Sequence, residues 1–280
     1  MVSMNRLVTE KRVRVVAALV EGNSIRATVR MTGVAKNTVT KLLVDLGEAC
    51  AAYQDETLRN LNCQRIECDE IWAFVYAKKK NVPADKAREF GYGDVWTWVA
   101  LDSDTKLVPS WLIGNRDSED ANAFMNDVAR RMATRVQLST DGFRPYLQAV
   151  RGAFREVDYG QIQKIYGTTS AGAGRYSPAA CIGASAYPVS GDPDPEKIST
   201  SYVERQNLTM RMGMRRFTRL TNAFSKKVEN LAAAVSLHFM YYNFARPHSS
   251  LGGKTTPAMA AGVADHVWTL EEIVGLLDRN

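Results

Sequence analysis

The stretch from Arg65 to Tyr76 reads Arg-Ile-Glu-Cys-Asp-Glu-Ile-Trp-Ala-Phe-Val-Tyr, and it decides the fold that we predict. It is rich in β-branched and aromatic residues, which favour a pleated strand. A polar loop (residues 77–93) follows, and two further strand-like segments come next, at residues 95–101 and 107–113. We therefore expect three consecutive strands that form a meander.

Helices and strands alternate after this meander. A helix is predicted to begin with Ser118 as its N-cap and to bury Ala121, Phe124, Met125, Val128 and Met132. A short strand (136–140) then ends at Asp141-Gly142, and a helix (145–154) and an extended segment (157–166) follow. Three strands, helix, strand, helix, strand is the order of the RNase H-like fold. The sequence thus predicts an α/β domain, an RNase H-like mixed sheet flanked by helices.

Three acidic residues fall at chemically suggestive places in this order. Asp69 lies within the first strand, Asp141 at the tip of the fourth, and Glu204 in the opening turn of a late helix. The first and fourth strands are neighbours in an RNase H arrangement, so the two aspartates could share a hard cation, which prefers oxygen ligands. Two metal ions about 3.5–4 Å apart can activate the attacking oxygen and stabilise the leaving oxygen of a phosphoryl transfer. We predict that Asp69, Asp141 and Glu204 are catalytic and bind Mg²⁺ or Mn²⁺, as two ions.

Two other acids of the first strand compete with Asp69. Adjacent strand positions face opposite sides of a sheet, so we expect Glu70 to point away from the metals. Glu67 shares the face of Asp69 and could serve as a helper ligand. The alternative for Asp69 itself is an acid exposed on a strand, with no catalytic role.

Residues 9–47 predict an all-α helix-turn-helix domain. Thr9 is expected to cap a first helix, Ser24 a short second one, and Thr32-Gly33-Val34 to turn into a third segment, residues 35–46. The third segment carries an apolar stripe, and its other face begins with short polar and cationic residues suited to a major groove. The predicted DNA-binding residues here are Lys36, Asn37, Thr38, Thr40 and Lys41. A three-helix bundle with no DNA role would share the apolar periodicity.

The positive charge of the chain is concentrated in two regions. The net charge is +6, and residues 204–227 carry +6 while residues 1–47 carry +5. Two basic regions on an otherwise near-neutral scaffold suggest a polyanion held at two places, although either could be a solvated basic surface. In the second region we predict DNA contacts from Arg205, Arg211, Arg215, Arg216 and Arg219. Arg211 falls on the same side of the late helix as Glu204, and Gly213 is expected to bend or end that helix.

Length and composition limit the remaining choices. At 280 residues the chain suits one small module and one medium domain. We expect a helix-turn-helix domain and linker at 1–60, the catalytic domain at 61–262 with an inserted loop at about 167–199, and a C-terminal helix at 263–280. The chain lacks an apolar run of about 18 residues and a signal-peptide pattern, and its four cysteines do not form a disulfide framework. These features predict an intracellular protein.

Three motifs carry a family resemblance. Cys68-Asp69-Glu70-Ile71-Trp72, Thr140-Asp141-Gly142 and the run from Tyr202 to Asn207 resemble the motifs of DDE-type, integrase-like insertion-sequence transposases. Arg211 matches the basic residue that such enzymes keep two turns after the glutamate. A segment from Tyr242 to Gly252, with Thr256-Pro257-Ala258, is similar to the closing segment of that family. The resemblance covers roughly residues 60–262, and Glu204 follows Asp141 by 63 positions, a longer interval than in compact integrases.

The resemblance implies a function. Such an enzyme cleaves DNA at the ends of a mobile element with divalent metal, and the released 3′-hydroxyl groups attack target DNA without a covalent protein intermediate. Its partner would be DNA, as terminal repeats and as target, bound by a homodimer or a larger assembly in the bacterial cytoplasm, at the nucleoid. Two alternatives stay open: an RNase H-like DNA nuclease or resolvase, and a helix-turn-helix DNA-binding regulator whose core is catalytically inactive.

Overall fold

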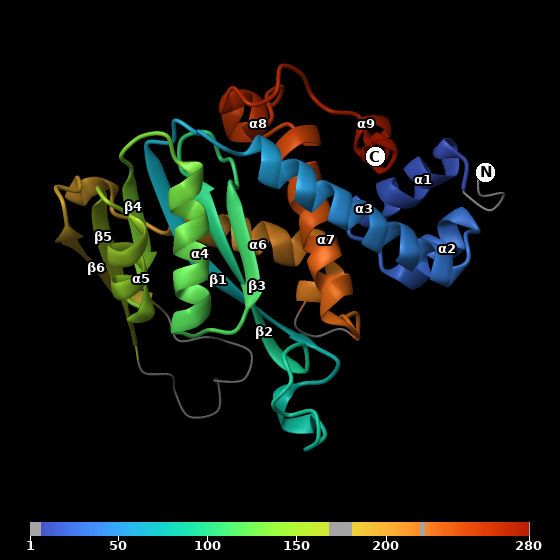
Figure 1. Ribbon diagram of the computed structural model, residues 1–280, viewed down its shortest axis with the longest axis horizontal. Helices are drawn as coiled ribbons and strands as arrows, with labels where there is room; N and C mark the ends of the chain where they lie inside the picture. The colour runs from blue at the N-terminus through green and yellow to red at the C-terminus, as the bar shows by residue number, and fades with distance from the viewer. Residues whose placement is uncertain (1–6, 168–180, 219–221, 280) are drawn as a thin grey trace.

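A six-stranded mixed sheet flanked by helices forms the centre of the molecule in the computed structural model (Figure 1). The structure describes residues 7–167, 181–218 and 222–279. The strands are β1 (Arg65–Val75), β2 (Gly93–Asp102), β3 (Ser110–Gly114), β4 (Gln137–Asp141), β5 (Asp158–Tyr166) and β6 (Cys181–Ser190). Their order is β3-β2-β1-β4-β5-β6. The predicted α/β sheet is confirmed, and its order is compatible with the RNase H-like core.

The register of the sheet places β1 between an antiparallel and a parallel neighbour. β1 pairs along its whole length with β2, from Ile66–Asp102 to Val75–Gly93. It pairs with β4 only over its first four residues, from Arg65–Gln137 to Cys68–Thr140. β4 and β5 are parallel, whereas β5 and β6 are antiparallel. Between Asp69 and Phe74, no described residue pairs with β1 on its β4 side, and the sheet opens there, before Val75 bridges Ser225.

Two strand predictions need correction. The third strand begins at Ser110, not at residue 107, because Asn243 donates to the Val108 carbonyl and accepts from its N–H, both at 3.0 Å. The expected loop at about 167–199 contains β6, an exposed edge strand that pairs with β5. Its small residues give a weak strand signal, and the pairing with β5 overrides it. The part of that loop at 168–180 lies outside the described residues.

The two faces of the sheet carry different helices. On one face lie α4 (Ser118–Arg131) and α5 (Pro145–Ala153), whose apolar residues pack with Cys68, Trp98 and Leu138. On the other face α6 (Ser201–Gly213) packs with α7 (Val228–Met240) against Ile71, Val99 and other strand residues. The N-cap of α4 is Asp117 and not Ser118, because the Asp117 carboxylate accepts the Asp120 N–H at 3.0 Å. A carboxylate at this place also interacts favourably with the helix dipole.

The N-terminal region is helical throughout, with α1 (Thr9–Val20), α2 (Ile25–Thr32) and α3 (Lys36–Thr57). Ser24 caps α2 and Gly33 takes a left-handed conformation (φ 68°) as predicted, while α1 is preceded by Val8, so Thr9 is its first residue and not its cap. α3 continues well past Leu46, because Cys50, Gln54 and other residues of its second half are buried. A Cβ on Gly47 would lie 2.4 Å from the Ala233 Cα, so α3 and α7 are in close contact.

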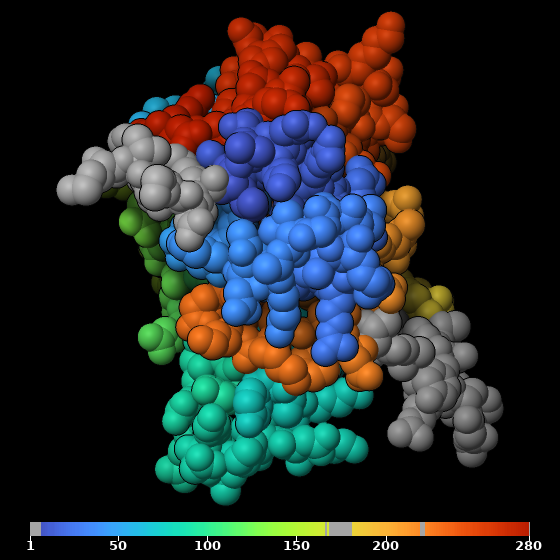
Figure 2. All heavy atoms as spheres, turned by 90° about the vertical axis from the view of Figure 1, so that its right-hand side faces the viewer, coloured from blue at the N-terminus to red at the C-terminus, as the bar shows by residue number. Residues whose placement is uncertain are grey.

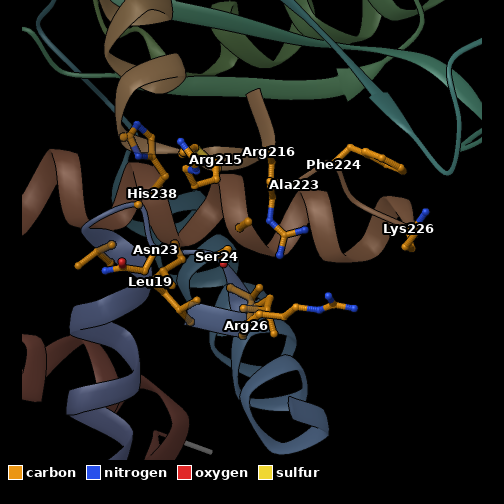
Figure 3. A pocket seen from close by; sticks show the side chains of 18 of the residues that line it. Leu19, Asn23, Ser24, Arg26, Arg215, Arg216, Ala223, Phe224, Lys226 and His238 are labelled. Atoms are coloured by element: carbon orange, nitrogen blue, oxygen red, sulfur yellow. The ribbon is translucent and has the colours of Figure 1, made fainter. Parts of the chain in front are cut away.

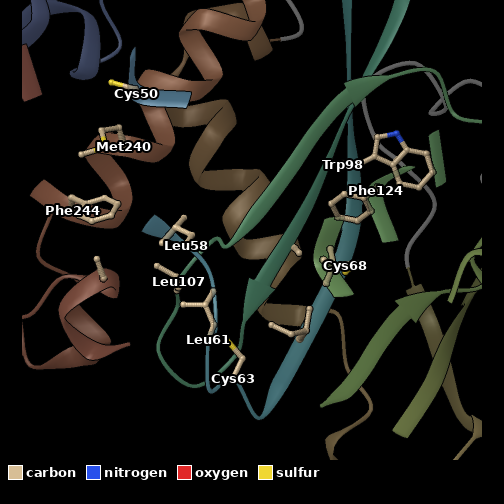
Figure 4. Packing of buried hydrophobic residues seen from close by; sticks show 14 of the residues in the cluster. Cys50, Leu58, Leu61, Cys63, Cys68, Trp98, Leu107, Phe124, Met240 and Phe244 are labelled. Carbon is tan, nitrogen blue, oxygen red and sulfur yellow. The ribbon is translucent and has the colours of Figure 1, made fainter. Parts of the chain in front are cut away.

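One apolar core joins these helices to the sheet. Cys50 and Leu58 pack with Met240 and Phe244, and the same cluster continues to Trp98 beneath α4 (Figure 4). The C-terminal elements α8 (Pro257–Ala260) and α9 (Leu270–Gly275) close this core, and α9 packs against α1. None of the helices in the described ranges has the length and the apolar character that a membrane crossing requires.

Candidate functional site

A cavity of about 600 Å³ opens where β1 runs past the end of β4. Its walls come from the middle of β1, the end of β4, β5 and α6. The residues that line it are Asp69, Glu70, Asp141, Gly142, Ile162, Gln163, Lys164, Glu204, Asn207, Leu208 and Arg211. All three predicted catalytic acids thus face one cavity, together with the predicted Arg211.

Three carboxylates in the cavity converge most closely. One oxygen each from Asp69, Glu70 and Asp141 lie within 4.8 Å of one another. This is a spacing at which one cation could contact all three, since carboxylate oxygens lie about 2–2.6 Å from Mg²⁺ or Ca²⁺. Glu204 is not part of this group. Its Oε1 accepts a hydrogen bond from Thr200 at 2.6 Å and pairs with Lys164.

The expectation that Glu70 points away from the site is wrong. Alternation puts the Glu70 Cβ on the α4–α5 face, but β4 ends at Asp141 and no strand separates the two faces there. The Glu70 side chain, 1% exposed, therefore reaches the Asp141 carboxylate past the open edge. Strand alternation decides the side on which a residue starts. It does not decide where a long side chain ends beside a missing neighbour.

Glu67 has a structural role instead of the helper role expected for it. Its Oε2 accepts hydrogen bonds from the N–H groups of Tyr202 and Val203, at 2.8 and 3.0 Å, and its Oε1 accepts from Ser103. Those N–H groups belong to the first turn of α6, where N–H groups have no partner within the helix. Glu67 is buried and absent from the cavity lining. It therefore fixes α6, and with it Glu204, to β1.

Cationic and amide groups balance the acids. Arg116, just beyond β3, donates from Nε to Glu70 Oε2 at 2.9 Å and from Nη2 to Asp141 Oδ2 at 3.3 Å. Its guanidinium lies 4.0 Å from the centre of the Phe143 ring, which holds it in place. Asn207 donates from Nδ2 to Asp69 Oδ2 at 2.9 Å. Arg116 and Lys164 belong to no motif, so sequence patterns do not identify either residue.

Burial and mutual repulsion alter the proton affinity of two of the acids. Burial, strengthened by the nearby Asp141 charge, raises the pKa of Asp69 to about 6. Burial also raises the pKa of Glu70 to about 7, although Arg116 acts in the opposite direction. Clustered carboxylates with raised pKa values are costly unless a cation compensates them.

Two oxygen atoms of the site fit a metal ligand role. Asn207 Oδ1 is buried, and within the described ranges it has no hydrogen-bond partner, whereas Glu70 Oε1 is buried in a carboxylate that interacts with the Tyr146 hydroxyl. The Asn207 oxygen requires a partner, because an unsatisfied buried acceptor costs about 1–3 kcal/mol. An all-oxygen set of acceptors suits Mg²⁺ or Mn²⁺ better than a soft metal. Asp69, Glu70 and Asp141, with Glu204 in the same cavity, are therefore the residues that could hold a metal.

The predicted DNA-binding residues occupy two places. Lys36, Asn37, Thr38 and Lys41 are exposed at the start of α3, whereas the Thr40 hydroxyl donates to the Lys36 carbonyl and Lys41 pairs with Asp45. On and after α6, Arg205 and Arg215 are exposed and Arg216 is partly buried. Arg219 lies outside the described residues. α6 ends at Gly213, as expected.

Comparison with protein-family models and with curated proteins found no match for this chain. Its site therefore has to be interpreted from its own geometry.

Proposed function

We propose that this chain is a DDE-type DNA transposase, which cleaves DNA at the ends of a mobile element and joins the 3′-hydroxyl to target DNA. One observation carries the proposal. The carboxylates of Asp69 and Asp141, from neighbouring strands, converge with Glu70 in a cavity that Glu204 of α6 also lines. Bound Mg²⁺ or Mn²⁺, as one or two ions, would supply the charge and the activated oxygen for phosphoryl transfer.

The residues of the cavity have separate tasks in this proposal. Asp69, Glu70 and Asp141 supply negative oxygen atoms for the cation, and Asn207 orients Asp69 through its 2.9 Å hydrogen bond. Arg211 lines the same cavity and supplies positive charge for a DNA phosphate. Glu204 would join the cation on release from Lys164, a change that a side-chain rotation can provide because Glu204 is 38% exposed.

The helical N-terminal region supplies DNA recognition in this proposal. Gly33, with φ 68°, turns the chain from α2 into α3, and the exposed polar residues Lys36, Asn37 and Thr38 begin α3. We propose that α2 and α3 form a helix-turn-helix and that α3 enters the major groove with these side chains. Strand transfer needs two DNA ends held together, so the working unit would be a homodimer or a larger assembly.

The test is incubation with duplex DNA that carries the sequences flanking the gene, with Mg²⁺ or Mn²⁺, and analysis for nicks and joined products. Wild type should give both products, and Asp141→Asn should give neither. The Asp85→Asn variant, which changes an exposed residue outside the cavity, serves as control. Nicks without joined products would favour a nuclease. Binding without any metal-dependent product would favour an inactive regulator and contradict the proposal.

A further inference from the structure

A second cavity, of about 580 Å³, lies between the N-terminal helices and the segment that links α6 to α7 (Figure 3). The N-terminal helices contribute Asn23, Ser24 and Ile25 at the start of α2. The end of α6 and the segment after it contribute residues 213–216, 222–224 and 226. In Figure 2 the N-terminal helices and the segment after α6 face the same side of the molecule. The two parts meet at Gly22, where an added Cβ would lie 2.8 Å from the Gly213 carbonyl oxygen.

The charge of this cavity has a single sign. Among the described residues, its lining includes no carboxylate and five basic residues: Arg26, Lys36, Arg215, Arg216 and Lys226. In the described part of the chain, none of these five forms an ion pair with an acid. Arg216 donates from Nη1 to the Ser225 hydroxyl, and burial lowers its pKa to about 10. Basic side chains gathered in a concave surface without acids attract an anion.

Two features of the inner wall also point to a ligand. His238 of α7 lines the cavity and is only 6% exposed, and its Nε2 has no hydrogen-bond partner within the described residues. α2 begins at the cavity, with Ser24 as its N-cap, so the partial positive charge of that helix end adds to the basic side chains. Figure 3 shows Arg216 extending toward α2, where Arg26 lies, with His238 at the other end of the cavity.

We propose that this cavity is a phosphate-binding site between the N-terminal helices and the segment after α6. Arg26 from α2 and Arg216 from the segment after α6 would hold the phosphate oxygens, since guanidinium groups bind phosphate with paired N–H donors. The phosphate belongs either to the DNA backbone or to a free phosphate compound. The DNA source rests on the proposed function, whereas the phosphate chemistry follows from the cavity itself.

The first experiment measures phosphate binding directly. Inorganic phosphate is titrated into the full chain by calorimetry, with EDTA present so that the carboxylate cavity holds no metal. Wild type should bind, and Arg26→Ala should weaken binding by about tenfold to a hundredfold, the usual effect of losing one charge-assisted hydrogen bond. Arg30→Ala is the matched control, because Arg30 is an exposed arginine of the same helix and does not line the cavity.

A second arm identifies the source of the phosphate. Binding of random-sequence duplex DNA is measured at several salt concentrations, again with EDTA. If the cavity holds a backbone phosphate, Arg26→Ala should reduce the slope of log K against log salt by about one, and Arg130→Ala, at an exposed arginine of α4 outside the cavity, should not. Loss of inorganic phosphate binding with an unchanged DNA slope would assign the site to a free phosphate compound.

Variants of residues after α6 and on α7 test the other wall of the cavity, with folding checked in parallel. Arg216→Gln and His238→Gln should each weaken phosphate binding while the unfolding temperature is recorded in parallel. Arg26 is exposed, so Arg26→Ala remains informative even if Arg216→Gln unfolds the chain. Phosphate and DNA binding equal to wild type in Arg26→Ala, in a folded protein, would overturn the proposal. That outcome would leave the proposed cleavage activity untouched, because its test requires metal and Asp141.

Discussion

The two cavities of this molecule differ in how their charge is arranged. In the carboxylate cavity, acids and bases alternate: Arg116 contacts Glu70 and Asp141, and Lys164 contacts Glu204. In the basic cavity, Arg26, Arg215 and Arg216 have no acidic counterpart among the described residues. The first is therefore organised by the protein itself, whereas the second depends on an external anion for its balance.

The two cavities also differ in the elements that support them. The middle of β1, the end of β4 and helix α6 hold the carboxylates, and Glu67 anchors α6 to β1 by two hydrogen bonds. Helices and an irregular segment from distant parts of the chain form the basic cavity, which Gly22 and Gly213 bring together. A sheet edge fixes side chains within narrow limits, as chemistry on a bound phosphate requires. The looser contact between helices in the basic cavity is sufficient to bind an anion by its charge.

The largest expected effect concerns the carboxylate cavity. Asp141→Asn keeps the size of the side chain and the oxygen that accepts the Phe143 N–H, but removes the negative charge that would bind metal. Metal-dependent cleavage should fall at least about a hundredfold, as when a group that stabilises transition-state charge is removed. DNA binding measured in EDTA should stay near the wild-type value.

The acids of β1 sharpen this prediction. Asp69→Asn and Glu70→Gln should both impair cleavage at saturating Mn²⁺, because both carboxylates reach the cluster. The exposed Asp85 gives a control, Asp85→Asn, that should cleave like wild type. Full activity in Glu70→Gln with loss in Asp69→Asn would mean that Glu70 belongs to the support of the site and not to its metal ligands.

A second prediction tests the support of the carboxylate cavity. Glu67→Ala leaves the N–H groups of Tyr202 and Val203 without their acceptor in a buried place, so the free energy of unfolding should fall by about 1–3 kcal/mol. Cleavage should fall as well, because α6 carries Glu204. Glu67→Gln retains an acceptor oxygen and should restore most of both properties in urea unfolding and cleavage assays. Equal losses in the two variants would show that the charge of Glu67, and not its hydrogen bonds, is required.

The sequence predicted the carboxylate cavity better than its details. Asp69 and Asp141 could be predicted to converge because the order of the elements makes the first and fourth strands neighbours, and Glu204 follows them in the third motif; all three line the cavity. The role of Glu70 depended on where β4 ends, a one-residue boundary that periodicity cannot fix. Arg116 and Lys164 come from separate strands or loops, and only the folded sheet reveals that they contact the acids.

The basic cavity could not be assembled from the sequence at all. The two basic regions are visible as charge, and the sequence assigns Lys36 to a predicted recognition helix and Arg215 and Arg216 to DNA contacts of the second basic region. Nothing in the pattern indicated that Arg26 would share a cavity with Arg216, since 190 residues separate them. The length of α3 was also underestimated, because its second half is stabilised by contact with α7 and not by a regular apolar stripe of its own.

A third prediction uses the imidazole of the basic cavity. Burial lowers the pKa of His238 to about 4, below the value of about 6.5 in the unfolded chain. Between these values the unfolded state binds more protons, so stability is retained above pH 6.5 and is lost as the pH falls toward 4. Between pH 7.5 and pH 5, His238 should lower the free energy of unfolding by about 2 kcal/mol. Denaturant unfolding of His238→Gln should show less decline with acid than wild type. An equal decline would mean that His238 has the same pKa in the folded and the unfolded protein.

The smallest expected effect is a rise in Tm when Mg²⁺ binds in the carboxylate cavity, a response that the basic cavity should not give. Asp69 and Glu70 have pKa values raised to about 6 and about 7, so in metal-free protein their contribution to stability is greatest below pH 4 and declines as the pH rises through 7. Mg²⁺ should offset that decline, because it binds the ionised acids. At ten times its Kd, Mg²⁺ would stabilise the folded chain by about 1.4 kcal/mol. This corresponds to a rise of about 3 °C in Tm, measured at pH 8 against NaCl of equal ionic strength.

At pH 5 the rise in Tm caused by Mg²⁺ should be much smaller, since protons occupy the same carboxylates. Asp85→Asn should respond like wild type and Asp141→Asn should not. A rise in Asp141→Asn equal to that of wild type, or one as large at pH 5 as at pH 8, would place the metal elsewhere on the molecule.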